Sequence, residues 1–151
     1  MKTSGMLPAN FPMDHYIAQC GDLLKRETNY ELEAENINLF SGFLNGSKVI
    51  HVPKVYNKLS TDQTLTMAFL EGRELSNIIN FDQSVRDEIS LHLIQLLFNE
   101  IFNFRMVQTD PNLANFLLSE GGKSLCVLDF GACSQVSEET DRLYKDLLTG
   151  T

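Results

Sequence analysis

Three residues in the second half of the chain have the types and the spacing that could hold metal ions and organise a phosphoryl transfer. Asp110 is followed by Asn115 five positions later, and Asp129 opens an Asp-Phe-Gly sequence after a short apolar run. In phosphoryl-transfer sites with this order, the first Asp orients the acceptor, and the Asn and the second Asp hold ions that bridge the phosphates. Mg²⁺ prefers oxygen ligands and usually takes only a few of them from the protein. The side-chain oxygens of these residues are therefore of the right type to bind it.

Each motif is weak evidence by itself, because Asp-Phe-Gly occurs in many folds and residues 109–112 could form a capped turn. The plain alternative is a pair of β-turns whose acidic residues lie on a solvated surface. Asp129 argues against this alternative, since it ends the apolar run 125–128 and a buried carboxylate is costly unless something pairs with it. The order and spacing of the motifs together favour the functional interpretation.

The composition fits one domain and excludes several classes of partner. The 151 residues are 43% hydrophobic, which is enough to bury one core. The net charge is −8 and the 12 Lys and Arg are scattered, so nucleic acid is not an expected partner. The three cysteines share no metal-type spacing and favour a reducing compartment. No apolar run is long enough for a transmembrane segment, and no targeting segment can be identified.

The hydrophobic periodicity predicts an α+β chain that is mostly helical. The clearest helix has an apolar residue every three or four positions from residue 84 to residue 104, with Asp82 or Ser84 as its cap. In chain order, the predicted elements are helix 13–45, strands 52–56 and 65–70, a short helix through residues 75–79, helix 84–104, strands 116–118 and 125–128 joined as a hairpin, and helix 138–148.

Two segments around the candidate residues resemble a known family, the UbiB/aarF-domain atypical kinase-like proteins. They are residues 104–112, Phe-Arg-Met-Val-Gln-Thr-Asp-Pro-Asn, and residues 127–132, Val-Leu-Asp-Phe-Gly-Ala. Residues 26–36 also resemble the family's signature helix, with Asn29 where the family usually has Asp. Bacterial relatives usually have His-Ala-Asp-Pro-His in the first segment, so this chain is more similar to the mitochondrial branch associated with coenzyme Q (ubiquinone) biosynthesis. The resemblance covers nearly the whole chain.

The resemblance implies a role for each candidate residue and ATP and Mg²⁺ as cofactors. Asp110 matches the catalytic-loop Asp, and Asn115 and Asp129 match the pair that binds metal. Glu27 and Glu33 lie on the helix whose acidic residues face the nucleotide-binding Lys, although the residues alone would favour a solvated helix face. The backbone that would meet adenine belongs to a hinge-like strand, Met67, Ala68, Phe69 and Leu70, which as a bare pattern is a buried strand.

The resemblance also implies which part of a protein-kinase-like fold the chain represents. A Gly- or Ala-rich loop over the phosphates and a strand Lys should precede the helix of Glu27 by several tens of residues, and 26 residues stand before Glu27. We therefore expect residues 1–151 to form one partial domain, with the C-terminal lobe, the regulatory helix and the hinge strands, and with the N-terminal lobe largely missing. Such a chain should bind Mg²⁺-nucleotide weakly and turn over little.

In full-length relatives the implied activity is Mg²⁺-dependent ATP binding and hydrolysis that supports lipid-quinone synthesis, on the matrix side of the inner mitochondrial membrane. The implied partners are coenzyme Q biosynthesis proteins and lipid precursors, with peripheral membrane association through the missing half. Two other functions stay open. One is a small-molecule phosphotransferase of the aminoglycoside-kinase type, which shares the Asp-to-Asn spacing but usually has His before the catalytic Asp, where this chain has Gln108-Thr109. The other is a nucleotide-binding or interaction module without catalysis.

Overall fold

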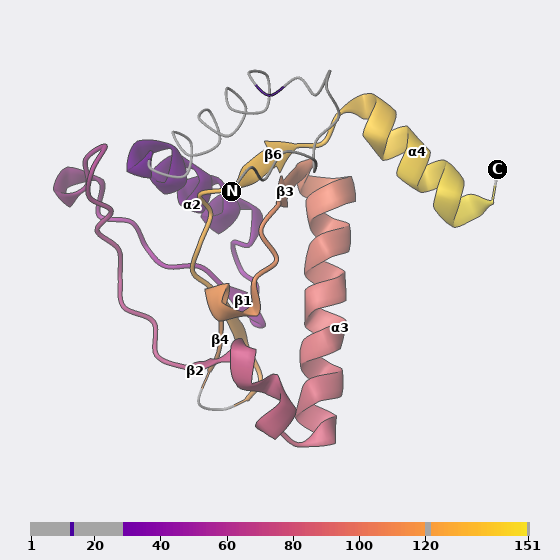
Figure 1. The fold of residues 1–151 in the computed structure, drawn as a ribbon, viewed down its shortest axis with the longest axis horizontal. Coiled ribbons are helices and arrows are strands. Elements are labelled where there is room, and N and C mark those ends of the chain that lie inside the picture. Colours follow the sequence, from indigo (N-terminus) through magenta and orange to yellow (C-terminus); the bar gives the residue numbers. More distant parts are fainter. Residues whose placement is uncertain (1–12, 14–28, 120–121, 151) are drawn as a thin grey trace, which may run out of the picture.

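The structure is a computed structural model that describes Met13 and residues 29–119 and 122–150. Helices lie around two small sheets, and the long helix α3 runs beside the strands (Figure 1). In chain order, the described elements are α2 (Tyr30–Phe43), β1 (Ile50–His51), a 3-10 helix (Asn57–Leu59), β2 (Arg73–Glu74), a 3-10 helix (Leu75–Asn80), α3 (Gln83–Asn99), a π-helix (Glu100–Phe104), β3 (Met106–Gln108), a 3-10 helix (Leu113–Asn115), β4 (Phe116–Leu118), β5 (Leu125–Val127), β6 (Cys133–Gln135) and α4 (Glu138–Thr149).

The two sheets bring together segments that are far apart in sequence. The larger sheet has the strand order β1-β5-β4-β2, in which β1 runs parallel to β5 and the other neighbours are antiparallel. The smaller sheet pairs β3 with β6 in antiparallel register, so that Gln108 lies opposite Cys133. The chain between β3 and β6 therefore leaves the small sheet, forms the β4–β5 hairpin in the large sheet and returns. This path places the ends of both motifs at one junction between the sheets.

The core fixes α2 against the Asp-Phe-Gly segment. Phe40 and Phe130 are each only 1% exposed, and their ring centroids lie 4.8 Å apart. The side-chain amide of Asn36, which is itself buried, donates a hydrogen bond of 2.8 Å to the carbonyl oxygen of Phe130. A buried amide without a partner would be strongly unfavourable, so this bond also specifies how α2 is oriented. The helix is therefore held to the loop by apolar packing and by a polar contact.

Local capping explains where the two outer helices begin. Asn29 precedes α2, and its side-chain oxygen accepts a bond of 3.1 Å from the N–H of Leu32. Ser137 caps α4 in the same way, accepting from Thr140. Farther along α4, the buried Asp141 accepts from Arg105 at 2.7 Å and from Lys145 at 2.9 Å. The bond from Arg105 ties the first half of α4 to the residue before β3, while the rest of α4 extends away from the sheets (Figure 1).

Most of the predicted elements are confirmed. The helix predicted over residues 84–104 is α3 followed by a π-helix, with Asp82 as N-cap, and the hairpin 116–128 and the last helix lie where they were expected. Of the predicted helix 13–45, the structure has Met13 and residues 30–43 as helix, and residues 14–28 lie outside the described part. Among the described helices, none is both long and apolar enough to cross a bilayer.

The two predicted strands 52–56 and 65–70 are wrong as regular strands. The segments do run antiparallel, but they share only the isolated bridge Val55–Met67 and two backbone bonds of 2.8 Å, from Tyr56 to Thr66 and from Ala68 to Lys54. The pairing cannot continue toward the turn, because the backbone leaves the extended conformation at the 3-10 helix Asn57–Leu59. The sequence pattern did not predict β1, β2, β3 and β6, which have two or three residues each and are too short to show an alternating pattern.

Gly72 allows β2 to approach β4 closely, and its substitution should destabilise the large sheet. A Cβ at Gly72 would lie 2.7 Å from the carbonyl oxygen of Leu118 and 2.9 Å from Cβ of Leu117. We expect Gly72→Ala to lower the free energy of unfolding, measured in urea, by about 1–3 kcal/mol, because backbone must move. The matched control is Gly42→Ala in α2, where a Cβ meets nothing within 4 Å. Equal stability of the two variants would contradict this prediction.

Candidate functional site

The loop that carries Asp110 is held at both ends by backbone bonds. The N–H of Thr109 donates to the carbonyl oxygen of Ala132 at 2.8 Å, which continues the β3–β6 pairing by one residue. The Asn112 side chain caps the following 3-10 turn by accepting from the N–H of Ala114 at 3.0 Å. That turn ends at Asn115, whose side-chain amide donates to Oδ2 of Asp110 at 3.5 Å. The five-residue spacing between Asp110 and Asn115 therefore corresponds to one turn, which brings the Asn115 side chain back to Asp110.

The Asp129 loop is attached to the same turn. The N–H of Leu128 donates to the carbonyl oxygen of Asn115 at 2.9 Å, and the side-chain amide of Gln108 donates to the carbonyl oxygen of Asp129. The carboxylate of Asp129 is oriented locally, since its Oδ1 accepts from the N–H of Gly131 at 2.9 Å. The backbone on both sides of Asp129 is therefore positioned by the segment that carries Asp110 and Asn115.

Three carboxylates line one cavity of about 490 Å³ between α2 and the two loops. They belong to Glu33, Asp110 and Asp129, and the other lining residues are Tyr30, Gly131 and Ala132. Burial raises the pKa of Glu33, the negative charge of Asp129 raises it further, and a backbone hydrogen bond from Phe130 partly opposes both effects. Glu33 thus lies beside Asp129, as its predicted place on the regulatory helix requires. The other predicted glutamate, Glu27, lies outside the described residues.

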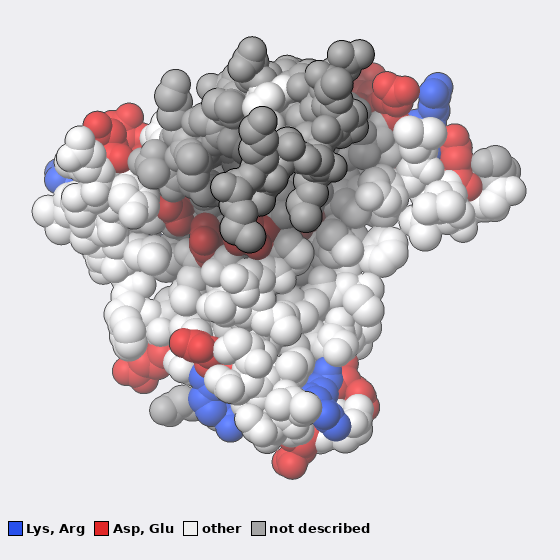
Figure 2. Space-filling model, viewed as in Figure 1, with Lys and Arg blue, Asp and Glu red and all other residues white. Residues whose placement is uncertain are grey.

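The carboxylates make the surroundings of the cavity strongly negative. Burial and the charges of Glu100, Asp129 and Glu33 together raise the pKa of the Cys133 thiol to about 12, so this cysteine is inert at neutral pH. In the view of Figure 2, acidic side chains appear in the middle of the molecule, and no continuous basic patch covers this face. In the described part of the chain, no Lys, Arg or His side chain pairs with Glu33, Asp110 or Asp129.

The donor set suits a magnesium ion that keeps water or phosphate ligands. The described residues include no group of three or more His, Cys, Asp and Glu side chains arranged to enclose a metal. Two carboxylates and an amide oxygen are nevertheless the hard ligands that Mg²⁺ takes from proteins, with the other positions left to water and phosphate. Asn115 touches Asp110 but is not among the residues that line the cavity. The residues therefore fit the ion by their chemistry, and the roles of Asp110, Asn115 and Asp129 stay predictions.

The hinge-like residues do not reach this cavity. The N–H of Ala68 is already used by Lys54, Phe69 is 87% exposed, and none of Met67, Ala68, Phe69 and Leu70 lines the cavity. The segment between β1 and β2 that carries them runs along the left edge of the view in Figure 1. A contact between these residues and adenine stays a prediction.

Three further residues organise the site, and sequence reasoning did not single them out. Gln108 holds the Asp129 carbonyl, Asn36 holds the Phe130 carbonyl, and Glu100 is an acidic residue that is buried. Gln108 and Asn36 lie inside the segments that carry the family resemblance, but position alone does not reveal a bond to a distant carbonyl. For Glu100 a signal existed, because it stands on the apolar side of the long helix, four positions after the buried Leu96.

Comparison with known proteins places the chain among longer proteins of similar sequence. The chain is 36% identical over 138 residues to "Atypical kinase COQ8B, mitochondrial" of Danio rerio, a match that covers 91% of this chain and 22% of that protein. It is 34% identical over 149 residues to "Atypical kinase COQ8, mitochondrial" of Saccharomyces cerevisiae, covering 99% of this chain and 30% of that protein. The chain thus spans between about a fifth and a third of the length of these relatives.

A solved structure and a family model agree with this placement. The fold matches the structure titled the complex of Rv3197 with erythromycin from Mycobacterium tuberculosis, with a TM-score of 0.75 and 24% identity over 86% of this chain and 33% of that one. That likeness shows the kinase-like fold, of which this chain has a partial lobe. The family model of the ABC1 atypical kinase-like domain matches residues 1–151, and the chain belongs to this family.

Proposed function

We propose that the chain supplies the metal-binding half of an ATP site, in an ATP-dependent step that supports ubiquinone biosynthesis. The observation that carries the proposal is the convergence of Glu33, Asp110 and Asp129 on one cavity without a cationic partner among the described residues. Unpaired carboxylates in one cavity repel each other, so a bound divalent cation would relieve an unfavourable arrangement. Membership of the ABC1 family and the names of the COQ8 relatives support the kinase-like and ubiquinone-related parts.

Each residue would have a role that follows from its position in the site. Asp129, oriented by the N–H of Gly131, would hold the metal together with the side-chain oxygen of Asn115. Asp110, at the exposed tip of its loop, would orient the group or the water that receives the phosphoryl. A bound Mg²⁺ would neutralise the negative charge on the phosphate oxygens. Glu33 lies on the other wall of the cavity, where it can accept from a cationic side chain that also contacts the phosphates.

Binding of a fluorescent ATP analogue in the presence of Mg²⁺ tests this function. We expect Mg²⁺-dependent binding by the 151-residue chain that is lost on chelation with EDTA. Asp129→Asn keeps the shape of the side chain but removes the charge, and should weaken binding by about tenfold or more, since even outer-shell changes have effects of that size.

The matched control for this measurement is Asp62→Asn. Asp62 is an exposed residue in the turn between Thr61 and Thr64, and it does not line the cavity. It should leave the affinity unchanged. Equal Mg²⁺-dependent binding by wild type and Asp129→Asn would refute the proposed site, because the charge that holds the metal would then lie elsewhere.

The cellular setting follows from the relatives and belongs to the same proposal. The COQ8 relatives are named mitochondrial, so we place the chain in the mitochondrion, with the matrix side of the inner membrane as its site of action. Its partners would be proteins of coenzyme Q biosynthesis and their lipid precursors. Fractionation of mitochondria with an antibody against the chain would test the location, and recovery only outside mitochondria would contradict it.

A further inference from the structure

Glu100 is an acidic side chain buried in largely apolar surroundings, and the proposed function gives it no role. It stands at the junction of α3 and the π-helix, and it is 5% exposed. Burial raises the pKa of its carboxyl group to about 7, and a hydrogen bond from the backbone of Gln108 partly opposes this. Insertions of a π-turn into a helix are frequent at functional positions. Placing an acidic group here is unfavourable by itself, so a specific contact must compensate for it.

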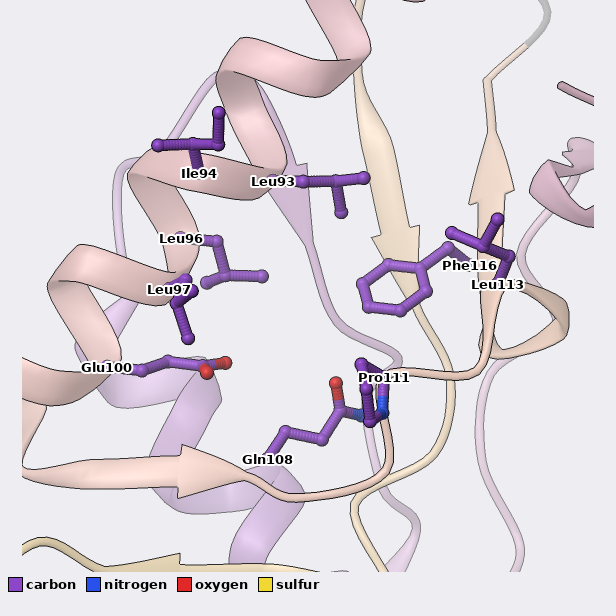
Figure 3. Close-up of a pocket in the computed structure, with 9 residues that line it drawn as sticks. All are labelled: Leu93, Ile94, Leu96, Leu97, Glu100, Gln108, Pro111, Leu113 and Phe116. Atoms are coloured by element: carbon purple, nitrogen blue, oxygen red, sulfur yellow. The ribbon is translucent and has the colours of Figure 1, made fainter.

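Figure 3 shows where the carboxylate points. It extends from the helix toward Gln108, across the edge of a cavity of about 280 Å³. The rest of this cavity is apolar, and its other lining residues are Leu93, Ile94, Leu96, Leu97, Pro111, Leu113 and Phe116. Within this lining, Gln108 is the residue that offers Glu100 polar groups, since the remainder are aliphatic, aromatic or proline side chains.

The register of the small sheet explains why the Gln108 N–H is free to bond Glu100. In an antiparallel pair, only every second residue directs its N–H toward the partner strand. The N–H of Thr109 is directed to β6, where it donates to Ala132 at 2.8 Å. The N–H of Gln108, one residue earlier, therefore faces away from β6. Glu100 and Gln108 line the same cavity, so we assign the Glu100 carboxyl group as the acceptor for this buried donor.

The side chain of Gln108 also contacts the loop that carries Asp129. Its side-chain amide donates to the carbonyl oxygen of Asp129, and its backbone continues directly into Thr109 and Asp110. A displacement of the Gln108 backbone would thus move Asp110 and release the carbonyl of Asp129 at the same time. The contacts form one path from Glu100, directly after α3, through Gln108 to both loops of the candidate metal site.

We propose that Glu100 is a positioning residue for this site, which fixes the Gln108 backbone from α3 and thereby sets the spacing between Asp110 and Asp129. This inference rests on the proposed function, because it concerns the same metal site. Glu100 does not touch the metal or the nucleotide. It acts as the acceptor that holds the loop, so a neutral acceptor of the same shape should replace it and an apolar side chain should not.

Two substitutions of Glu100 and one matched control separate this role from packing. Glu100→Leu fills the apolar cavity but offers no acceptor, and Glu100→Gln keeps an acceptor oxygen without the charge. The control, Glu88→Leu, removes a glutamate from the same helix whose side chain is 50% exposed. Each protein is measured for the hydrogen-exchange rate of the Gln108 amide by NMR, and for the affinity of Mn²⁺ alone by electron paramagnetic resonance.

We expect Glu100→Leu to speed exchange of the Gln108 amide about tenfold and to weaken Mn²⁺ binding about tenfold, as loss of an outer-shell contact does. Glu100→Gln should restore both to near the wild-type values, and Glu88→Leu should change neither. Unchanged Gln108 exchange in Glu100→Leu would overturn the contact. Faster exchange with unchanged Mn²⁺ affinity would overturn the positioning role.

The same measurements distinguish a failure of the proposed metal site from a failure of the contact between Glu100 and Gln108. If the wild-type chain binds no Mn²⁺, the metal site itself is refuted and Glu100 has no site to position. The exchange rates would then still report whether Glu100 holds Gln108, so this result is distinct from a failure of the contact. Equal loss of Mn²⁺ affinity in Glu100→Gln and Glu100→Leu would also overturn the inference, because it would show that charge rather than hydrogen bonding matters.

Discussion

Replacement of Phe130 by alanine is expected to lower the free energy of unfolding by about 3–5 kcal/mol, the usual effect of removing a fully buried phenylalanine. The ring of Phe130 is 1% exposed and contacts Phe40 of α2 at a centroid distance of 4.8 Å. The substitution would leave a cavity at the point where α2 meets the Asp-Phe-Gly loop. Since small domains are stable by only about 5–15 kcal/mol, a large part of the folded population should be lost in moderate urea.

The measurement is urea unfolding followed by circular dichroism, with Phe69→Ala as the matched control. Phe69 is 87% exposed, so its replacement should change the free energy of unfolding by about 0.5 kcal/mol or less. Loss of Phe130 should also loosen Glu33, because α2 depends on this contact for its place against the loop. Equal destabilisation by the two substitutions would mean that α2 does not pack on Phe130 as described.

The second large effect is a loss of stability with rising pH that comes from Glu100. The pKa of this carboxyl group is raised from 4.5 to about 7 in the folded chain, mainly by burial. Between these two pH values the folded state keeps a proton that the unfolded state has lost, so unfolding releases a proton. Its stabilising contribution is therefore complete below pH 4.5 and is lost as the pH rises through about 7. The difference corresponds to about 3 kcal/mol.

Glu100→Gln should abolish this part of the pH dependence. At about pH 8 we expect the variant to be about 2–3 kcal/mol more stable than the wild type, and at low pH the two should be similar. Burial raises the pKa of Glu33 as well, with Asp129 adding to the effect, but this contribution is present in both proteins and cancels in the difference. Urea unfolding over a series of pH values measures it. A difference that does not grow with pH would contradict the buried position of Glu100.

The sequence by itself determined the local elements and the identity of the motifs. The β4–β5 hairpin follows from two apolar runs around a Gly-containing turn, and the start of α4 follows from the Ser137 cap. Both depend on interactions between residues that are near in sequence, and such interactions leave a readable pattern. The order and spacing of Asp110, Asn115 and Asp129 predicted that a turn and a hairpin connect them, and the structure has both.

The sequence failed where its local signal was short or ambiguous. The segment that contains Met67 to Leu70 has the residues of a strand, yet it forms only an isolated bridge, because its partner segment turns into the 3-10 helix Asn57–Leu59. The short strands β3 and β6 were not predicted, although they hold the segment that leads to Asp110 in place. In these cases the pairing partner, rather than the intrinsic preference of the segment, decides what forms.

Only the tertiary structure decided which distant side chains meet at the site. Asn36 and Phe130 are 94 positions apart and Gln108 and Asp129 are 21 apart, yet each pair shares a hydrogen bond. The same packing sets Glu33 beside Asp129 and buries Glu100 behind Gln108. Such contacts depend on how whole elements pack, since a polar group enters the interior only where a partner meets it. The residue types therefore indicate the chemistry of the candidate site, and the packing of α2 and α3 on the two sheets determines which groups meet there.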